Sequence, residues 1–429
     1  MTARGRDEPD GKRGQILAMM IISLLALCAV VAVAADVGFF FDYRRRMQTA
    51  ADAAAMAGAH HVRRERLLGR APNLTDVQNE GYKATASNGF TNGANSTQVT
   101  VNWPPLSGRY ANDGFVEAIV TQPRPTVFMA ILGFQSATVT TRAVAGIKDS
   151  DLCVLALQPT LPKAINMNGS FSVTANCRIA DNSNDSDALD DSGGACMIAK
   201  SIAVTGTAGG NGTCFTPPPT NNAPREPDPF AALAAPTFSL PCNYSNQSIN
   251  GAGTWTLSPG VYCGGIRIQG QGGSGCPTQV TFQPGTYVLY GGGLDVNGGC
   301  LTGTDVTFYN TGTTSGANQY SRIQIQGNVT GGLYAPTTGS MVTMLFFQDR
   351  AFSGGQANIV NGNTGLTLQG TLYFPTTPVT FAGGASSTGA AAYTILVAGS
   401  IKFTGGATFN DDFSSLPGGS PLKTVALAE

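Results

Sequence analysis

Cysteine is the residue type in this 429-residue chain whose number and spacing point most clearly to a chemistry. Cys28 lies in an apolar N-terminal segment, and no two of the other cysteines have the C-x-x-C spacing of zinc sites and thioredoxin-like motifs. An even number without metal spacing predicts four disulfides in an oxidising compartment, whereas the alternative is eight buried free thiols. The eight disulfide candidates are Cys153, Cys177, Cys196, Cys214, Cys242, Cys263, Cys276 and Cys300.

An acidic stretch beginning at residue 181 is the best candidate for a metal site. Asp181, Asp185 and Asp187 offer carboxylate oxygens at alternating positions, as a calcium-binding loop would. The glycine and the glutamate that an EF-hand needs at loop positions six and twelve are both serines here. We therefore expect a solvated loop, with neither a metal ion nor another cofactor.

Residues for enzymatic catalysis are scarce. Histidine occurs only at His60 and His61, so Ser/His/Asp and Cys/His catalysis is excluded from all later parts of the chain. Clustered aspartates with lysine or arginine could still cleave an acidic polysaccharide. Between Phe230 and Gln348, however, the charged residues are only Arg267, Asp295, Asp305 and Arg322. The sequence predicts a protein that is not an enzyme and has no small-molecule substrate.

Composition divides the chain near residue 150. The first 150 residues contain 16 Lys/Arg and 12 Asp/Glu, and the later residues contain 9 and 14. Neither part is basic enough to predict a nucleic-acid partner. Of the 55 glycines, 42 follow residue 150, which indicates a second region of different architecture.

A membrane anchor is predicted over residues 14–41. From Ile16 to Ala35 the run of 20 residues is apolar except for Ser23, and a helix of that length spans about 30 Å, the thickness of a bilayer core. We expect lipid contact through residues 16–41 and a cytoplasmic segment at 1–13. Disulfides then require the C-terminal mass to lie outside the cytoplasm.

A cleaved signal peptide is the alternative to this anchor. Ala32-Val33-Ala34 has the small-x-small pattern of a cleavage site. Apolar character resumes after Asp36 and continues to Phe41, which favours a retained span. Since a carboxylate within hydrocarbon is costly, we expect Asp36 to be hydrated at the outer interface; the alternative is a contact between subunits of an assembled fibre or complex.

Residues 42–150 are predicted to form a long helix, a short helix and a small sheet. The segment 42–68 contains no proline and has alanines at rough helical spacing, and Thr75 is expected to cap the short helix. Alternating patterns predict strands at 98–103, 114–121 and 137–145. A helix that leaves the membrane and packs on antiparallel strands is the general plan of a pilin-like subunit.

Residues 14–59 resemble the N-terminal signature of the Flp/Tad pilus-assembly proteins, TadE/TadG-like. The matching elements are the apolar run ending in Asp36-Val37-Gly38 and a Q-x-x-A-D-A-A-x-x-A-G-A stretch that contains Gln48, Asp52 and Gly58. If prepilin peptidase cut after Gly14, the fifth mature residue would be Met19, where pilins carry Glu. The resemblance is therefore to a TadG-type accessory protein rather than to the polymerising pilin.

This resemblance implies a single-pass protein of the bacterial inner membrane with a periplasmic or extracellular C-terminal domain. It implies a minor pilin-like accessory of pilus assembly or secretion, whose partners are other pilus-assembly proteins. Some longer TadG proteins contain a von Willebrand-type domain with a D-x-S-x-S metal site; Asp185 stands at the second Ser, and the other parts of that domain are missing. A cell-surface adhesin that binds glycans is the alternative function.

A repeat indicates the fold of the Gly-rich part. The motif at Pro259 recurs 25 residues later at Pro284, among short β runs separated by Gly-rich turns. This pattern predicts a parallel β-helix, with Val261 near Thr286 and Ile266 near Leu294, and a Gly-rich β-sandwich is the alternative. The predicted α+β chain then comprises a β-rich segment at 151–216, a Pro-rich surface linker at 217–240 and a β-helix-like domain at 241–429.

Overall fold

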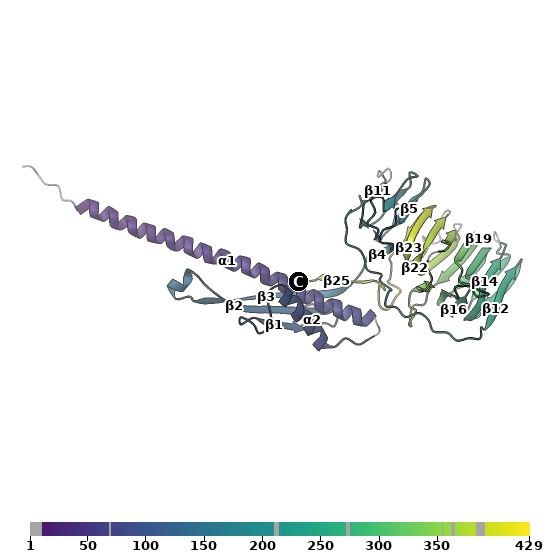
Figure 1. Cartoon of the computed structure of the whole chain (residues 1–429), viewed down its shortest axis with the longest axis horizontal. Coiled ribbons are helices and arrows are strands. Elements are labelled where there is room, and N and C mark those ends of the chain that lie inside the picture. Colours follow the sequence, from purple (N-terminus) through teal and green to yellow (C-terminus); the bar gives the residue numbers. More distant parts are fainter. Residues whose placement is uncertain are drawn as a thin grey trace, which may run out of the picture. The chain divides into compact units, whose positions relative to one another are not determined.

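The computed structural model describes residues 11–67, 70–209, 214–271, 275–353, 355–361, 365–382 and 391–429. The chain divides into two compact units, each of which is described by itself (Figure 1). Unit 1 comprises Met1–Lys148 together with Lys423–Glu429, and unit 2 comprises Asp149–Leu422. The sequence places residues 423–429 in the β-helix-like domain, but they form part of the sheet of unit 1.

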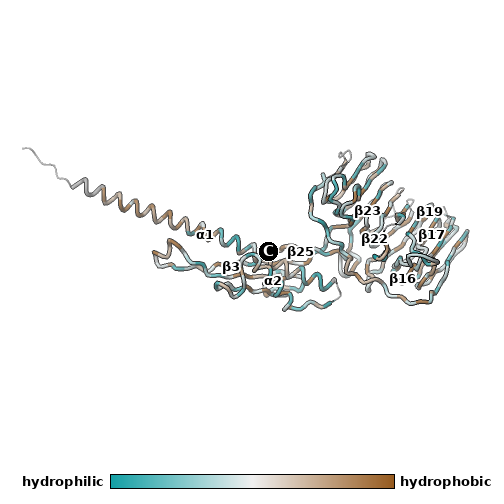
Figure 2. Tube along the Cα trace, viewed as in Figure 1, coloured by the Kyte–Doolittle hydropathy of each residue, from teal (hydrophilic) through white to brown (hydrophobic). Residues whose placement is uncertain are grey.

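Unit 1 is built on one long helix, α1, which runs without interruption from Gly11 to Leu67. Its N-terminal part is strongly hydrophobic (Figure 2), and side chains such as Leu17, Ile22 and Val30 are more than half exposed. By length and composition α1 can cross a membrane. The exposed apolar surface is what a lipid-facing segment requires.

A second helix and an antiparallel hairpin system complete unit 1. The helix α2 spans Leu74–Ser87, and its N-cap is Asn73, whose side-chain oxygen accepts the Asp76 amide at 2.9 Å. The predicted cap at Thr75 is therefore wrong by two residues, because Asn73 already satisfies the first turn. The four-stranded sheet has the order β1 (Gln98–Asn102), β2 (Phe115–Pro125), β3 (Ser136–Asp149) and β25 (Lys423–Leu427), and the 3-10 turn η1 (Met129–Leu132) lies between β2 and β3.

Small side chains on the C-terminal half of α1 form the core of unit 1. Ala50, Ala51 and Ala54 are fully buried, and they pack in one cluster with Val101 and Val116 of the sheet. Because alanine carries only a methyl group, the helix can approach the strands closely. Burying these surfaces stabilises the docked helix far more than helix propensity alone would.

Unit 2 is dominated by a 17-stranded sheet of parallel pairs. The paired residues Tyr244 and Tyr262 of β12 and β14 are 18 positions apart, and Phe308 and Phe346 of β18 and β20 are 38 positions apart. Ile266 pairs with Leu294, which confirms that part of the predicted register. Val261 pairs with Val288 rather than lying beside Thr286, so the prediction for this pair is wrong by two residues.

The strands of unit 2 are mostly short. They are β4 (Leu152–Ala156), β5 (Ile165–Met167), β6 (Ser172–Ala175), β7 (Arg178–Asp181), β8 (Leu189–Asp190), β9 (Cys196–Ile198), β10 (Ser201–Val204), β11 (Phe215–Thr216), β12 (Tyr244–Asn250), β13 (Gly253–Leu257), β14 (Gly260–Gln269), β15 (Thr278–Phe282), β16 (Gly285–Tyr290), β17 (Leu294–Gly303), β18 (Val306–Thr311), β19 (Ile323–Tyr334), β20 (Met344–Gln348), β21 (Asn358–Asn361), β22 (Leu366–Ala382), β23 (Thr394–Thr404) and β24 (Ala407–Phe409). A smaller parallel sheet has the order β11-β9-β6-β24.

Aromatic rings stack through the interior of unit 2. Neighbouring ring centroids in this stack lie between 4.5 Å (Tyr244–Tyr262) and 6.2 Å (Phe346–Phe374) apart. The members come from successive paired strands and are Tyr244, Tyr262, Tyr287, Phe308, Phe346 and Phe374. Such rings bury large apolar areas and gain further from tilted or offset contacts.

The chain enters unit 2 in the middle of the strand ladder. The strand β4 pairs with β7 on one side and with β23, which lies about 240 residues later, on the other. The first strands, β4 to β11, therefore extend the ladder in one direction. The chain then passes to the far end, where β12 begins, and returns strand by strand to β23.

Residues 217–243 connect the two ends of the ladder and pack against its strands; this segment is called the strap here. The main chain at Glu226 exchanges two hydrogen bonds of 2.8 Å with the side chain of Asn182. The guanidinium of Arg350 donates to the carbonyls of Phe230 and Leu233. The predicted linker at 217–240 lies at the surface, with most residues exposed or half-buried, but it is held to the side of the ladder, where Phe230 is buried.

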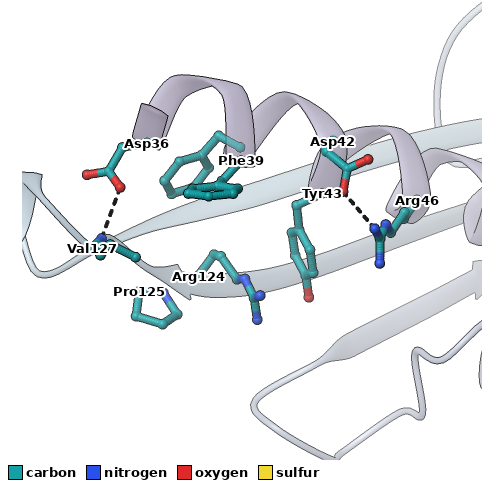
Figure 3. A pocket seen from close by; sticks show the side chains of 9 residues that line it. Asp36, Phe39, Asp42, Tyr43, Arg46, Arg124, Pro125 and Val127 are labelled. Carbon is teal, nitrogen blue, oxygen red and sulfur yellow. Dashed lines mark hydrogen bonds and ion pairs between the residues drawn. The ribbon is translucent and has the colours of Figure 1, made fainter. Parts of the chain in front are cut away.

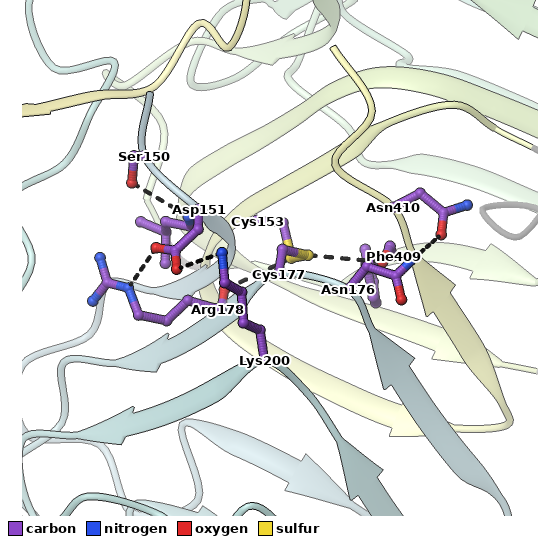
Figure 4. The surroundings of a disulfide bond; sticks show 10 residues. Ser150, Asp151, Cys153, Asn176, Cys177, Arg178, Lys200, Phe409 and Asn410 are labelled. Atoms are coloured by element: carbon purple, nitrogen blue, oxygen red, sulfur yellow. Dashed lines mark hydrogen bonds and ion pairs between the residues drawn. A yellow bond between two sulfur atoms is a disulfide. The ribbon is translucent and has the colours of Figure 1, made fainter. Parts of the chain in front are cut away.

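Four disulfides join neighbouring parallel strands of unit 2. They pair Cys153 with Cys177, Cys196 with Cys214, Cys242 with Cys263 and Cys276 with Cys300. The first lies beside Asp151, whose carboxylate is within 3.4 Å of Arg178 and 3.3 Å of Lys200 (Figure 4). Cys28 is the free cysteine among the described residues, and it is exposed on α1.

Candidate functional site

The junction between α1 and the β2–β3 hairpin brings an ionisable side chain into the apolar part of unit 1. Asp36 accepts hydrogen bonds from the backbone amides of Val127 at 3.1 Å, Phe128 at 2.9 Å and Met129 at 2.6 Å. The residue is only 2% exposed, so the expected hydration of Asp36 is wrong. The hairpin folds back along the helix and supplies the donors that water would otherwise provide.

A cavity of about 520 Å³ opens beside this contact (Figure 3). The ring of Tyr43 forms one wall, and its hydroxyl donates to the side-chain oxygen of Gln122. The guanidinium of Arg124 lies 4.4 Å from the centre of that ring. Arg46 also lines the cavity and pairs with Asp42 at 2.9 Å. Burial raises the pKa of Tyr43, so this phenol stays protonated at neutral pH. The cavity combines apolar walls with two arginines and with the carboxylates of Asp36 and Asp42.

The other signature residues hold α1 to the sheet. Gln48 donates to the carbonyl of Arg142 on β3 at 3.0 Å and to Asp52 on its own helix at 2.8 Å. Arg142 in turn pairs with buried Glu117 at 2.6 Å. The structure thus places Gln48 and Asp52 in a polar link between helix and strand, where they position elements and carry no reactive group.

Gly58 fits where α1 approaches both α2 and β2. A Cβ atom at this position would lie 2.8 Å from Val116 Cγ1 and 3.1 Å from Val77 Cγ1. Both distances are shorter than van der Waals contact, and β-branched valines have little freedom to move aside. The glycine of the signature therefore permits the close packing of this module.

We expect Gly58→Leu to destabilise unit 1 by about 1–3 kcal/mol, because the added side chain overpacks this crossing. Gly38→Leu is the matched control, since nothing lies within 4 Å of a Cβ built at Gly38. The measurement is the thermal melting of the full chain in detergent, with limited proteolysis of residues 42–148 as a second signal. Equal melting of the two variants would contradict this role of Gly58.

The acidic loop does not gather its carboxylates around a common point. Asp181 is buried and accepts the amides of Ser183 at 2.9 Å and Ile165 at 3.1 Å, whereas Asp187 lies 3.4 Å from Lys163. Asp185 accepts the amide of Asp187 at 2.8 Å. Among the residues that the structure describes, no group of three or more His, Cys, Asp or Glu side chains is arranged to hold a metal ion.

Burial changes the pKa of Asp181. Desolvation raises its pKa to about 7 from the ordinary value of 3.8, although the two backbone hydrogen bonds act in the opposite direction. The folded protein therefore keeps a proton at pH 5–6 that the unfolded chain has already lost. Stability contributed in this way is complete below about pH 4 and is lost as the pH rises to about 7.

We expect Asp181→Asn to remove this pH dependence, because an amide is neutral throughout. The free energy of unfolding of the variant, relative to that of the wild type, should rise by about 4 kcal/mol between pH 4 and pH 8. Chemical denaturation of both proteins at several pH values measures this difference. A constant difference across that range would show that Asp181 titrates normally.

Of the four charged residues considered for polysaccharide cleavage, three have structural partners. Arg267 and Asp295 are paired across β14 and β17, with 3.5 Å between Nε and the carboxylate. Asp305 accepts the amide of Thr337 at 3.4 Å. The structure spreads these side chains along the ladder, and the prediction of a non-enzymatic protein stays a prediction.

Sequence reasoning missed the partner of Asp36. The apolar stretch at residues 127–132 was visible as a break between two alternating strand patterns, but its main chain carries no sequence signal for contact with a helix 90 residues earlier. The useful signal is a combination: a single acid at the end of a membrane span, and an uncharged apolar hairpin loop in the same module.

Residues 14–61, which are 48 of the 429 residues, match the Tad family, described as Flp pilus-assembly TadE/G-like. This match confirms the resemblance predicted from the apolar run and the Gln48–Ala59 stretch. It covers α1 through most of its length and ends before α2. No curated protein and no solved structure matches the chain.

Proposed function

From the match of residues 14–61 to this pilus-assembly family, we propose that the protein is a membrane-anchored, minor pilin-like accessory of Flp/Tad pilus assembly or secretion. It acts by protein–protein contacts and not as an enzyme. The family match is the observation that carries the proposal. The packing of α1 on an antiparallel sheet supports the comparison with a pilin subunit.

The proposal assigns a periplasmic or extracellular position to unit 2. Each of its four disulfides joins two neighbouring strands, and disulfides persist in oxidising compartments rather than in the cytoplasm. The span of α1 would then have its N-terminus in the cytoplasm. This orientation makes unit 2 available to other envelope proteins.

Unit 2 is further proposed to be a parallel β-helix that serves as a rigid spacer or docking body. Parallel pairing with offsets such as 18 and 38 residues supports this architecture, as does the aromatic stack, to which successive paired strands each contribute a ring. Repeated circuits bury their apolar side chains against one another and need little charge. A rigid body of this kind can present a long surface to partners without any catalytic group.

A glycan-binding adhesin is the alternative function. Sugar rings stack on exposed aromatic side chains, so a row of exposed Tyr or Trp would favour it. In the described part of unit 2 no tyrosine or tryptophan is exposed, and Trp255 is only partly accessible. The accessory role is therefore the one that we propose.

Co-purification tests the proposal. The full chain with an affinity tag is isolated from detergent-solubilised membranes of the cell that encodes it, beside the Gly58→Leu and Gly38→Leu variants. We expect pilus-assembly proteins to be enriched with the wild type and with Gly38→Leu, and to be reduced with Gly58→Leu. If no such protein is enriched, while the purified chain binds or degrades a defined glycan, the accessory role is wrong.

A further inference from the structure

The loop at the end of the β2–β3 hairpin, residues 126–135, exposes a cluster of large apolar side chains and is called the apolar tip here. Ile131 is 85% exposed, Val127 and Phe134 are each 61% exposed, and Phe128 is 40% exposed. These four side chains lie within eight consecutive residues. A contiguous apolar patch of this kind marks a site of contact with a membrane or another protein.

The apolar tip contains no charged residue, and the preceding charged residue in the sequence is Arg124. No Asp, Glu, Lys or Arg occurs from Thr126 to Thr141. Arg124 lies over the ring of Tyr43 on the cavity wall. Arg46 of α1, which is paired with Asp42, lines the same cavity on the other side of Tyr43 (Figure 3). An apolar end followed by arginines is the arrangement that suits a bilayer surface, where cations meet lipid phosphates.

The main chain of the apolar tip is also prepared for an apolar environment. The amides of Val127, Phe128 and Met129 donate to Asp36, and the amides of Ile131 and Phe134 donate to carbonyls within the loop. Backbone groups without partners are strongly unfavourable in hydrocarbon. The Asp36 carboxylate therefore accepts hydrogen bonds from three amides of the loop, and these hydrogen bonds stabilise its negative charge.

The same three hydrogen bonds fix the depth of the apolar tip relative to α1. Asp36 follows directly after the apolar run that ends at Ala35, which is where a span of about 30 Å leaves the hydrocarbon core. The next residues of α1 remain apolar, and Phe39 and Phe41 are both more than 60% exposed. Val37, Phe40 and Phe41 of the helix line one surface cavity together with Met129 of the loop, so apolar side chains of the two elements lie side by side.

We propose that the apolar tip is a second membrane contact, which inserts its exposed side chains into the outer boundary of the bilayer that α1 crosses. Asp36 is the positioning residue that holds the tip to the helix at that depth. Continuity with the span of α1 identifies lipid, rather than a second protein, as the partner. This inference depends on α1 crossing a bilayer and does not depend on a role in pilus assembly.

Depth-dependent fluorescence quenching tests the inference. The full chain with Ile131→Trp is reconstituted into phosphatidylcholine vesicles with or without bromine atoms on the acyl chains, and the wild-type signal from Trp103 and Trp255 is subtracted. We expect the added emission to be blue-shifted and to be mostly lost in the brominated vesicles. Because Ile131 is exposed, the substitution leaves the packing of unit 1 unchanged.

Leu106→Trp is the matched control, since Leu106 is 78% exposed in the same unit. It precedes β2, whose 11 residues place it about 35 Å from the tip. Its added emission should not be quenched by brominated lipid. If Ile131→Trp behaves in the same way, or is blue-shifted but insensitive to bromine because protein covers it, the proposed lipid contact is wrong.

The role of Asp36 has its own measurement. In the Ile131→Trp background, Asp36→Ala should reduce quenching by brominated lipid, because the loop is released from the helix. The variant should still sediment with the vesicles, because replacing Asp36 by alanine extends the uninterrupted apolar run of α1. Unchanged quenching would show that Asp36 does not position the tip.

Discussion

Reduction of the four disulfides is expected to destabilise unit 2 more than any single substitution would. Each bond closes a loop of 18 to 24 residues. In the chain-entropy description, a loop of this length contributes about 3 kcal/mol by restricting the unfolded chain. Loss of all four would remove on the order of 10 kcal/mol, which is comparable to the whole stability of a typical domain.

Thermal melting of the full chain in detergent, with and without reductant, measures this effect. Replacing one pair at a time by serine should lower stability by about 3 kcal/mol for each pair, whereas Cys28→Ser should change nothing, because Cys28 is exposed and unpaired. The denatured but unreduced chain should show one reactive thiol. Nine reactive thiols in that assay would contradict the four bonds.

Phe308→Ala is expected to have the second-largest effect. Phe308 is fully buried, and its ring lies 5.3 Å from Tyr287, 5.1 Å from Phe282 and 5.4 Å from Phe346. Truncating a buried phenylalanine costs about 3–5 kcal/mol, since the transfer energy is lost and a cavity is left. The cavity would also separate the rings on either side of it along the ladder.

Phe308→Leu is the control, because it keeps most of the side-chain volume and should lose less than half as much stability. Denaturation midpoints of the two variants give the comparison, and limited proteolysis shows where the chain opens. We expect the new cleavage sites of Phe308→Ala to lie in the strands that flank β18. A loss of stability below about 1 kcal/mol would mean that the aromatic stack does not support the ladder.

Local patterns were enough to predict the two helices and the first three strands of unit 1. The apolar run and the alanine-rich stretch predict α1, because both depend on residue spacing within one helix. The three strands of the hairpin system also follow from local alternation. The addition of β25 to this sheet was not predicted, because a strand of five residues has no local feature that identifies β3 as its partner.

The register error at Val261 has a simple cause. Aligning the two P-G-x-Y motifs places Tyr262 opposite Tyr287, but the backbone pairs Tyr262 with Leu289. The shift of two residues leaves inward and outward faces unchanged, because side chains alternate with a period of two along a strand. Sequence similarity therefore predicted the correct faces and the wrong partners.

The strap and the entry point of the chain could not be predicted from composition. The prolines and polar residues of the strap resemble those of a surface linker. The need for the chain to cross the length of the ladder follows only from the position of β4 between β7 and β23. Phe230 and Phe238 within the segment are the residues that pack on Tyr373 and Tyr309. Isolated aromatics in a Pro-rich stretch are a weak signal.

The candidate site was only partly visible in the sequence. Asp36, Gln48, Asp52 and Gly58 were identified through the family signature. The structure gives Asp36, Gln48 and Gly58 contacts between α1 and the rest of unit 1, whereas Asp52 bonds to Gln48 on the same helix. Their partners lie on the hairpin and on β3, whose contact with the helix is a property of the folded module. The signature thus encodes the packing of α1 within unit 1.

Deletion of the gene, with complementation by the wild-type chain, tests the proposed role in pilus assembly. Surface pili are counted by electron microscopy, and pilin is quantified in the fraction sheared from the cells and in whole cells. We expect sheared pilin to be lost while cellular pilin remains, and we expect the wild-type chain to restore it. Normal surface pili in the deletion strain, with purified protein that degrades or tightly binds a defined glycan, would contradict the account.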